Sequence, residues 1–494
     1  MKKSIFTFCL ALTTVLALNA ESYSGNIVVN RNGQVYNSNV TVTVTQQDNG
    51  LFQLDLNVPI FGNMKMVDVP AATTGGITVY SSQQKVSTSL DALTGGPLLT
   101  QLFARTTGGM MAANVTLPTA NATMWFNTVG NTFQLPNSDL EAWSGSNGEP
   151  DRWHGFKTAT GTWAWAAPAS LAKSEDVHSG SAGQYSALIT AKDAFGTIAN
   201  GTMTSGRLNA GSTSASSKSN HASSSADYGD DYYMPLLAKP DQFKVWLKYQ
   251  QGTSNAANKA NVSVKTFDGT YYQEPADKDY TNISGGILEG EGQIAACDWT
   301  QFTFPINYDY WAANNAETNG IFVTFSTNAN PGQGSNNDML YIDEMELVYL
   351  GSMSDLRYKG ETINGWNPAV TEYSIETAGE PNLDDFTATV VGASAVMTKS
   401  MEQNADGTYR IVLSVVSADL QNAASYIITA TAAAPARQGD VNGDGLVDVA
   451  DVALLINVIL GTRSGDGLAT DVNGDSLVDV SDVAMLINIV LGNH

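Results

Sequence analysis

Three features of the sequence predict a mostly β, multi-domain protein that ends in a small α-helical unit. The chain has 494 residues, a length that suggests several domains rather than one hydrophobic core. Runs rich in β-branched residues alternate with polar residues and are separated by turns that contain Gly and Asn, which is typical of antiparallel strands. Near the C-terminus the pattern changes to two apolar stretches that each end at a glycine, as helices often do.

Composition excludes some classes of partner. The formal net charge is −24, and only 15% of the residues are charged. An acidic surface repels polyanions, so we expect neither nucleic acid nor an anionic membrane surface as a partner.

The N-terminus predicts export. Lys2 and Lys3 precede an apolar run over residues 5–18, and Ala20 offers a small residue for cleavage, so residues 1–20 are expected to be a secretory signal peptide. We expect the protein to be secreted, whether extracellular, on the cell surface or in the periplasm. Cys297 is then the only remaining cysteine, which predicts a chain without internal disulfides. No later stretch is long and apolar enough for direct membrane insertion.

Residues 21–130 predict antiparallel β structure. Val40, Val42 and Val44 alternate with threonines, the segment 48–50 reads Asp-Asn-Gly, and a second alternating run covers residues 52–58. Two period-2 runs around an Asn-Gly turn indicate a hairpin. The pattern resembles the calycin-like β-barrel domains of secreted bacterial proteins. Such a barrel could hold a small apolar ligand, or it could be a filled spacer.

Residues 131–350 carry a second set of landmarks: Leu-Pro-Asn-Ser-Asp-Leu-Glu-Ala-Trp at 135–143, Pro-Asp-Arg-Trp-His at 150–154, His-Ser-Gly at 178–180, Val-Trp-Leu-Lys-Tyr at 245–249, Asp-Trp-Thr at 298–300 and Leu-Tyr-Ile-Asp-Glu at 340–344. This order resembles the family called "putative carbohydrate metabolism domain" and, more distantly, jelly-roll carbohydrate-binding modules. The resemblance implies a jelly-roll sandwich that associates with polysaccharide.

The related modules hold a structural calcium ion, and hard cations favour carboxylate and carbonyl oxygens. The resemblance therefore implies a calcium site formed by Glu141 and Asp343, which would lie on the first and last strands. The alternative is that both carboxylates are solvated charges at loop edges.

Aromatic residues of this segment fall into two groups. Trp143, Trp153, Trp246 and Trp299 occupy the family landmarks and are expected in the core. Seven others lie in stretches that read as loops, where exposed rings could stack on sugars: Trp163, Trp165, Tyr228, Tyr232, Tyr233, Tyr310 and Trp311. Of these, Trp163, Trp165 and Trp311 are the carbohydrate-binding candidates. Residues 205–231, rich in Ser, Ala and Asn, are expected to form a long surface loop.

Residues 353–433 predict a smaller β unit. The runs Leu-Arg-Tyr-Lys-Gly at 356–360, Ile-Asn-Gly-Trp-Asn-Pro at 363–368 and Tyr-Ser-Ile at 373–375 resemble the immunoglobulin- or cadherin-like sandwiches that space domains in secreted proteins. We expect no chemistry there.

Residues 438–494 contain a duplicated acidic loop. The segment that begins at Asp440 recurs 31 residues later at Asp471, with 17 of 22 aligned positions identical. Each loop offers oxygens at positions 1, 3, 5, 7, 9 and 12, the spacing with which an EF-hand surrounds calcium. The predicted ligands, with a backbone carbonyl at position 7, are Asp440, Asn442, Asp444, Leu446, Asp448 and Asp451, and Asp471, Asn473, Asp475, Leu477, Asp479 and Asp482.

The two loops differ at position 6, which is Gly445 in the first and Ser476 in the second. If this position takes a left-handed conformation, the second loop should bind calcium more weakly.

An apolar helix is expected after each loop but no full helix before it, so the unit resembles a type I dockerin. The resemblance implies a calcium-dependent cohesin-type partner, recognised through loop positions 10 and 11, which are Val449, Ala450, Val480 and Ser481. These are not the Ser-Thr pair of the best-known members. Near-identical repeats would allow two binding orientations related by a half-turn.

Three functions compete. The sequence favours a secreted, glycan-binding component of a polysaccharide-degrading assembly that docks through its dockerin. A glycoside hydrolase acting on O-glycosyl bonds, with its site in the jelly roll, is the alternative enzyme hypothesis; the chain shows no HExxH, G-x-S-x-G or P-loop motif. The third hypothesis is a non-catalytic structural or adhesive surface protein.

Overall fold

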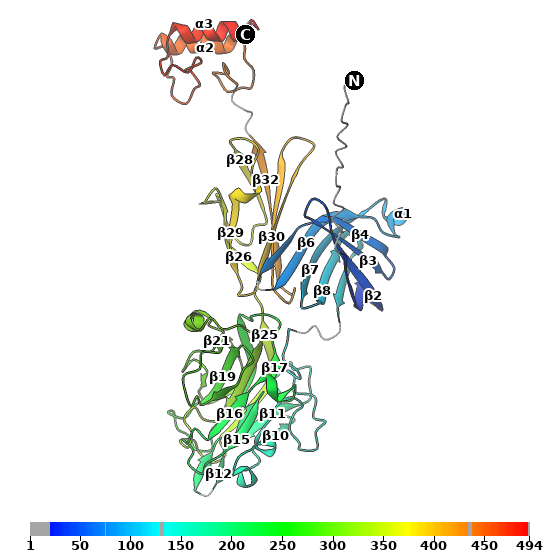
Figure 1. Cartoon of the computed structure of the whole chain (residues 1–494), viewed down its shortest axis with the longest axis vertical. Helices are drawn as coiled ribbons and strands as arrows, with labels where there is room; N and C mark the ends of the chain where they lie inside the picture. Colours follow the sequence, from blue (N-terminus) through cyan, green and yellow to red (C-terminus); the bar gives the residue numbers. More distant parts are fainter. Residues whose placement is uncertain (1–19, 75, 129–132, 195, 433–436, 493–494) are drawn as a thin grey trace, which may run out of the picture. The chain divides into compact units, whose positions relative to one another are not determined.

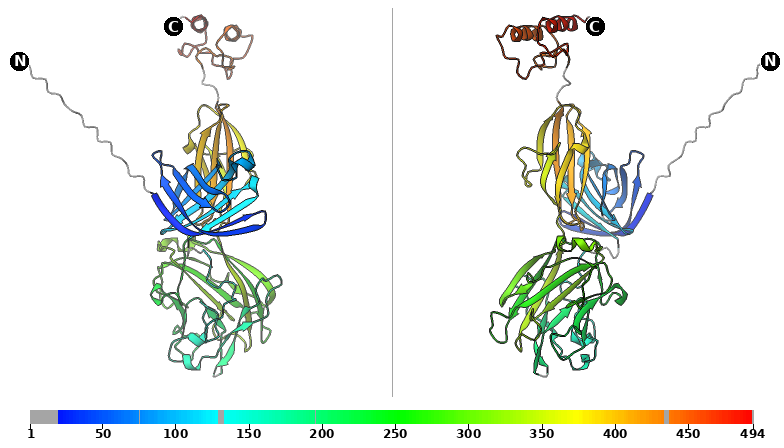
Figure 2. Two further views of the ribbon diagram at one scale, coloured as in Figure 1. Left: turned by 90° about the vertical axis from the view of Figure 1, so that its right-hand side faces the viewer. Right: turned by 60° about the vertical axis from the view of Figure 1, so that its left-hand side comes forward.

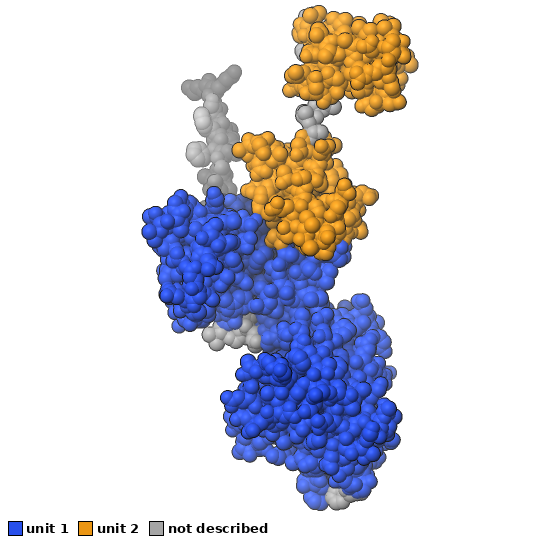
Figure 3. Space-filling model, turned by 180° about the vertical axis from the view of Figure 1, so that it is seen from behind, with its two compact units in different colours: residues 1–354, 389–398, 414–424 blue, residues 355–388, 399–413, 425–494 orange. Residues whose placement is uncertain are grey.

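The computed structural model describes residues 20–74, 76–128, 133–194, 196–432 and 437–492. The predicted signal peptide therefore lies outside the described residues, except for Ala20. Two compact units are present: residues 1–354, 389–398 and 414–424 form one, and residues 355–388, 399–413 and 425–494 form the other (Figure 3). Within the described part of the chain, no helix is long and apolar enough to cross a membrane. The fold is mostly β with helices at the C-terminus, as the sequence predicted (Figure 1).

The N-terminal region is one antiparallel sheet of nine strands that curls into a nearly closed barrel (Figure 2). Its strand order is β4-β3-β2-β1-β9-β8-β7-β6-β5. The elements are β1 (Ala20–Arg31), β2 (Gln34–Gln46), β3 (Phe52–Val58), β4 (Gly62–Val69), β5 (Ala71–Thr74), β6 (Ile77–Val86), α1 (Asp91–Thr94), β7 (Leu98–Thr107), β8 (Met110–Leu117), η1 (Pro118–Ala120) and β9 (Ala122–Asn127).

The predicted hairpin is β2 and β3, and its apolar alternation forms the barrel core. Val42 pairs with Leu56 and Val44 with Leu54, and all four side chains are buried. Side-chain hydrogen bonds help to close the barrel between β4 and β6. The Gln84 amide donates to the Val67 carbonyl at 2.8 Å and accepts from its N–H at 3.2 Å.

Residues 133–350 form a layered β domain. Its five-stranded sheet has the order β10-β11-β25-β18-β23, and its six-stranded sheet has β14-β24-β19-β21 with β17 and β22 as side pairings. The strands are β10 (Leu171–Ser174), β11 (Ser186–Thr190), β14 (Thr202–Thr204), β17 (Met234–Pro235), β18 (Gln242–Gln250), β19 (Ala260–Phe267), β21 (Ile283–Gly286), β22 (Gln293–Ile294), β23 (Cys297–Pro305), β24 (Gly320–Ser326) and β25 (Met339–Val348). The remaining elements are η2 (Phe156–Thr158), η3 (Ala164–Ala166), η5 (Asp309–Asn314) and the pair β12 (Lys192–Ala194) and β13 (Thr197–Ala199).

The core of this domain lies between the two large sheets. Along β18, Phe243, Val245 and Leu247 are buried, while the residues between them are partly exposed. Ile321 and Val323 of β24 belong to the same apolar cluster. The period-2 pattern of each strand thus turns one face of each sheet inward.

A third, smaller sheet covers the outer face of the six-stranded sheet, with strand order β15-β16-β20. It consists of β15 (Arg207–Ala210), β16 (Asn220–Ser224) and β20 (Tyr272–Glu274), and η4 (Ala226–Tyr228) follows β16. Leu208, Ala222 and Tyr272 pack on Phe267 and Phe322 of the sheet beneath. The expectation of one long surface loop over residues 205–231 is therefore wrong. Small side chains that looked like loop composition are instead buried: Ser223, Ser224 and Ser225 are almost inaccessible.

Residues 352–432 form two further sheets. A three-stranded sheet has the order β27-β26-β29, and a four-stranded sheet has β28-β32-β31-β30, in which β28 and β32 run parallel. The elements are β26 (Ser352–Tyr358), β27 (Glu361–Thr362), β28 (Glu372–Thr377), η6 (Leu383–Asp385), β29 (Phe386–Val391), β30 (Val396–Gln403), β31 (Tyr409–Val416) and β32 (Ala423–Ala432).

The C-terminal unit, by which we mean residues 437–492, contains α2 (Val449–Ile459) and α3 (Val480–Val490), which lie side by side (Figure 1). Each helix begins before the apolar stretch expected from the sequence, because loop position 9 is its N-cap. Asp448 caps α2 in a capping box with Asp451, and Asp479 caps α3 with Asp482. Both repeats contribute to one small core, made of Val441, Leu454, Leu455, Val472, Val483 and Leu486, in which Val441 and Leu455 are equivalent to Val472 and Leu486.

Candidate functional site

The two acidic loops are organised by their own carboxylates. In the first loop, Asp440 Oδ1 accepts the N–H groups of Gly443 and Asp444 at 2.8 and 3.1 Å, and Oδ2 accepts that of Gly445 at 2.8 Å. The Asp451 carboxylate is fully buried and accepts three backbone N–H groups, from Val441, Asn442 and Asp448.

The second loop repeats this network residue for residue. Asp471 accepts the N–H groups of Gly474, Asp475 and Ser476, and buried Asp482 accepts those of Val472, Asn473 and Asp479. The loops therefore share one backbone path, although their sequences differ at position 6.

Position 6 adopts a left-handed conformation in both loops. Gly445 has φ 85° and Ser476 has φ 68°. Glycine takes this conformation without a steric cost, whereas serine places Cβ close to backbone atoms. Ser476 thus has the left-handed conformation that should make the second loop bind calcium more weakly than the first.

The donors of each loop suit a hard cation, because they are all carboxylate, amide or carbonyl oxygens. Within the described residues, however, no three His, Cys, Asp or Glu side chains are already gathered tightly enough to hold a metal ion. The carboxylates at positions 1 and 12 instead hold backbone N–H groups, which fixes the turn at positions 4–6. Leu446 and Leu477, whose carbonyls are the predicted position-7 ligands, have exposed side chains.

The predicted partner-binding residues are accessible. Val449 is 73% exposed and Val480 is 74% exposed, and Ala450 and Ser481 beside them are also exposed. They occupy matching places at the start of α2 and α3, next to the two loops.

Glu141 and Asp343 meet the same loop of the layered domain, residues 178–185. Glu141 Oε1 accepts the N–H groups of Gln184 and Tyr185, both at 2.8 Å. Asp343 Oδ1 accepts the N–H of Glu344 at 2.9 Å and lies near the backbone of His178. Burial raises the pKa of Asp343 to about 6, with the charge of Glu344 adding to the shift. Asp343 lies on β25 as expected, but Glu141 lies in an irregular segment rather than on a first strand.

Asp343 is an orphaned acceptor that a cation would satisfy. Its side chain is 0% exposed, and among the described residues its Oδ2 atom accepts no hydrogen bond. An unpartnered buried carboxylate is costly, so this atom fits the calcium site that the sequence predicts. Its burial also places Asp343 out of reach of a sugar, so this carboxylate is unsuited to flank a glycosidic bond.

The four landmark tryptophans differ in burial. Trp153 is fully buried and packs against Phe325, as expected of a core residue. Trp143, Trp246 and Trp299 are only partly buried. Trp246 lies on the outer face of β18, where the His178 ring stacks on it at 4.1 Å between centroids. The loop around His178 therefore covers this part of the five-stranded sheet.

Of the three predicted sugar-binding tryptophans, two lie together. Trp163 and Trp165 stack with centroids 6.3 Å apart and ring planes inclined by 27°, and Trp165 is 80% exposed. The Trp163 N–H donates to the Ala210 carbonyl at 2.8 Å, which places this pair at the end of β15. Trp311 lies elsewhere, in η5, where it is partly buried beside the cluster of Phe267 and Phe322.

The sequence alone did not reveal that the third sheet gathers other predicted aromatic residues. Tyr228 and Tyr232 both lie against the guanidinium of Arg207 on β15. Arg207 was missed because residues 205–231 read as a loop. The available signal was the alternation of Arg207, Leu208, Asn209 and Ala210, a short period-2 run.

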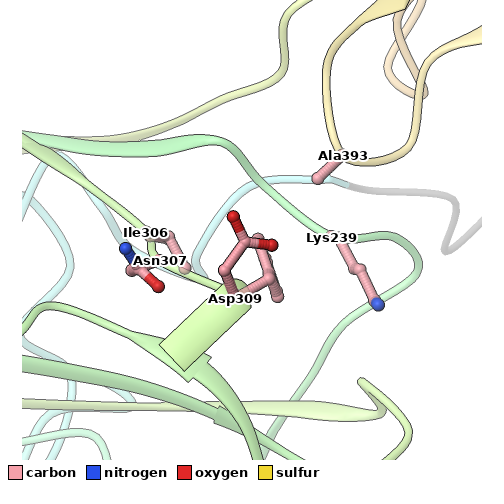
Figure 4. Close-up of a pocket in the computed structure, with 6 residues that line it drawn as sticks. Lys239, Ile306, Asn307, Asp309 and Ala393 are labelled. Atoms are coloured by element: carbon pink, nitrogen blue, oxygen red, sulfur yellow. The ribbon is translucent and has the colours of Figure 1, made fainter. Parts of the chain in front are cut away.

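A separate pocket of about 380 Å³ is lined by Lys239, Ile306, Asn307, Tyr308, Asp309 and Ala393 (Figure 4). It contains none of the residues predicted for metal, sugar or partner binding.

Comparison with known proteins identifies the C-terminal unit. Among solved structures, a "putative glycoside hydrolase" from Bacteroides thetaiotaomicron is 13% identical with a TM-score of 0.31, over 51% of this chain and 86% of that one. The CBM22-1 xylan-binding domain of Paenibacillus barcinonensis Xyn10C is 14% identical with a TM-score of 0.18, over 39% of this chain and 90% of that one. Likeness at this level carries no functional argument. No curated protein sequence matches. Residues 438–491 match the family described as dockerin type I domain, so the two-loop unit is a type I dockerin domain.

Proposed function

We propose that this protein is a secreted, non-catalytic glycan-binding component that docks through its calcium-loaded dockerin domain onto a cohesin-type module in polysaccharide breakdown. The observation that carries this proposal is the dockerin domain at residues 438–491, since dockerin domains bind cohesin modules. Each of its loops would hold one calcium ion through the oxygens of positions 1, 3, 5, 7, 9 and 12.

Glycan binding is supported by the exposed Trp163–Trp165 pair. Trp165 is 80% exposed, so burial in a core does not account for the position of its ring. Two nearly parallel indoles offer an apolar platform of the kind on which a sugar ring stacks. Trp311 is not part of this platform, because it is partly buried in another cluster.

The layered domain would also hold one structural calcium ion through Glu141 and Asp343. Bound there, the ion would supply positive charge to the buried Oδ2 atom of Asp343 and would fix the loop 178–185, which both carboxylates already contact.

Replacing Trp163 and Trp165 together by Ala should lower retention of the full-length protein on polysaccharide affinity gels about tenfold or more, because both stacking rings are lost. Thermal unfolding should stay nearly unchanged, since neither side chain is buried. Tyr310→Ala, which removes a 70% exposed ring elsewhere in the domain, is the matched control and should retain binding. If the unmutated protein binds no plant or host glycan, the glycan-binding role is rejected.

Docking should require calcium, and either repeat alone should be able to support it. Binding to a panel of type I cohesin modules, measured by calorimetry, is expected in calcium and not in excess chelator. Val449→Asp or Val480→Asp alone should cost about twofold, because the other repeat remains available. The double substitution should abolish docking, since it places a negative charge in the interface with the cohesin in both binding orientations. A single substitution that abolishes binding would rule out two equivalent orientations.

Ser476→Gly should strengthen the weaker calcium site of the dockerin. Relief of the left-handed strain is worth about 1 kcal/mol, or about fivefold in affinity. Titration of the calcium-free protein should show two unequal sites in the parent and two similar sites in the variant. Gly445→Ser, the reciprocal substitution, should weaken the first site by a similar factor. Equal sites in the parent would contradict the assignment of strain to Ser476.

Asp343→Asn should remove the stabilisation of the layered domain by calcium. In the parent, calcium should raise the midpoint of thermal unfolding of this domain, because the ion satisfies a buried carboxylate. In chelator at neutral pH, the variant should be more stable than the parent by about 1–3 kcal/mol, since a desolvated charge is gone. Asp298→Asn, at a side chain that is 90% exposed, is the control. Calcium stabilisation that survives in the variant would place the ion elsewhere.

A further inference from the structure

The outer face of the third sheet carries a row of three polar side chains, of which Arg207 is partly exposed and Ser223 and Gln273 are buried. Arg207 of β15 pairs in register with Ser223 of β16, and Ser223 pairs with Gln273 of β20. Residues directly opposite one another in an antiparallel sheet point to the same face. Because Leu208 and Ala222, next to this row, pack into the cluster beneath the sheet, Arg207, Ser223 and Gln273 point the other way.

Aromatic rings hold the guanidinium of Arg207. Its central carbon lies 4.8 Å from the ring centroid of Tyr228 and 4.4 Å from that of Tyr232. Tyr232 in turn packs on His154 with centroids 4.4 Å apart, and the Tyr271 ring meets Tyr228 edge-on at 6.4 Å. The guanidinium is thus fixed by cation–π contacts rather than by an acidic partner.

The hydrogen-bond donors of Arg207 remain available. Among the described residues, its guanidinium has neither a hydrogen bond nor an ion pair, and the side chain is partly exposed. Asp227, Asp230 and Asp231 follow in the nearby chain, yet none forms an ion pair with it. Burial lowers the pKa of His154, which favours the neutral form of this neighbour. The faces of the planar guanidinium are occupied by aromatic rings, and its N–H groups are free. Such a guanidinium matches a carboxylate, which it can bind through two parallel hydrogen bonds.

The surroundings of Arg207 suit a sugar that carries this carboxylate. Tyr271, which is 38% exposed, donates to buried Gln273 Oε1 at 2.8 Å, and the hydroxyl group of partly exposed Tyr228 lies 3.4 Å from that of buried Ser223, so two tyrosines that carry hydroxyl groups adjoin the cation. At the other end of β15, the backbone N–H of Trp163 donates to the Ala210 carbonyl. Arg207 and Ala210 are three residues apart on one strand, a distance of roughly 10 Å. One glycan chain could therefore contact both the Trp163–Trp165 pair and Arg207.

We propose that Arg207, cradled by Tyr228 and Tyr232, binds the carboxylate of a uronic acid residue, so that the glycan recognised by this domain is an acidic polysaccharide. This inference rests on the proposed glycan binding and adds the class of sugar. The net charge of −24 repels dense polyanions, so an acidic polysaccharide needs a specific contact, such as that of its carboxylate with the Arg207 guanidinium, in order to bind.

The test compares uronate oligosaccharides of one length with their carboxyl-reduced, neutral counterparts and with sulfated oligosaccharides, on the full-length protein. The parent should bind the uronate form at least tenfold more tightly than the reduced form. Arg207→Gln should remove this difference and leave binding of the reduced form unchanged. Arg207→Lys, which keeps the charge but not the fork, should retain part of it. Lys173→Gln, which removes a cation held on the rings of Trp143 and Tyr185, is the matched control and should change nothing.

Several outcomes would overturn the inference. If Arg207→Gln weakens binding of both forms equally, or leaves the uronate preference intact, Arg207 does not read the carboxylate, although the proposed glycan binding stands. Sulfated oligosaccharides that bind as tightly as uronate ones would show general anion binding instead of carboxylate recognition. If no oligosaccharide or polysaccharide binds, the inference and the proposed function fail together. Thermal unfolding of each variant separates these effects from a loss of folding.

Discussion

Irregular segments of this chain are held by carboxylates that accept backbone N–H groups. Buried Asp338 accepts those of Gly252 and Ser335 at 2.9 and 2.7 Å, and buried Glu149 accepts the N–H of Lys157 and the hydroxyl of Thr158. A carboxylate offers several acceptor sites, and hydrogen bonds to a charged acceptor are stronger than neutral ones. One side chain can therefore organise a whole turn. Because the described residues include one cysteine, which is free, no disulfide shares this task there.

The dockerin loops use the same interaction and extend it. Asp440 and Asp451 each accept three backbone N–H groups, so the loop path is defined by the protein itself. The remaining carboxylates of the loop lie on the same short segment and repel one another. A divalent cation removes this repulsion and adds ligand bonds, so metal binding and folding of this small unit should be coupled. The strained φ of Ser476 affects only the second repeat, so it breaks the equivalence of two otherwise matching loops.

The parts of the fold that could be predicted from the sequence are those with strong local signals. The loop spacing and terminal glycines indicated both helices, and the Asp-Asn-Gly turn indicated the β2–β3 hairpin. The third sheet was missed because its strands are short and its buried residues, such as Ala222 and Ser224, are small. A run of small residues can be recognised as a strand only when the neighbouring sheet on which they pack is known. Glu141 was placed on a strand for a related reason: a landmark residue shows position in a family, not local backbone conformation.

The landmark tryptophans also show position in a family and not whether a loop covers them. Which faces of the sheets are covered determines where a binding face is available. Along β18, Trp246 faces outward, but the loop of His178 lies over it, and Asp176 of the same loop region accepts hydrogen bonds from Trp299 and Lys248. The outer face of the five-stranded sheet is thus partly covered by a loop, and that of the six-stranded sheet is covered by the third sheet through Phe267 and Phe322. Aromatic residues on the two large sheets consequently serve packing. On the third sheet, Ser223 and Gln273 are buried, whereas Arg207 is partly exposed beside Tyr228 and Tyr232. The edge of this sheet is where the exposed Trp163–Trp165 pair lies, and its outer face is where the Arg207 guanidinium keeps its donors free.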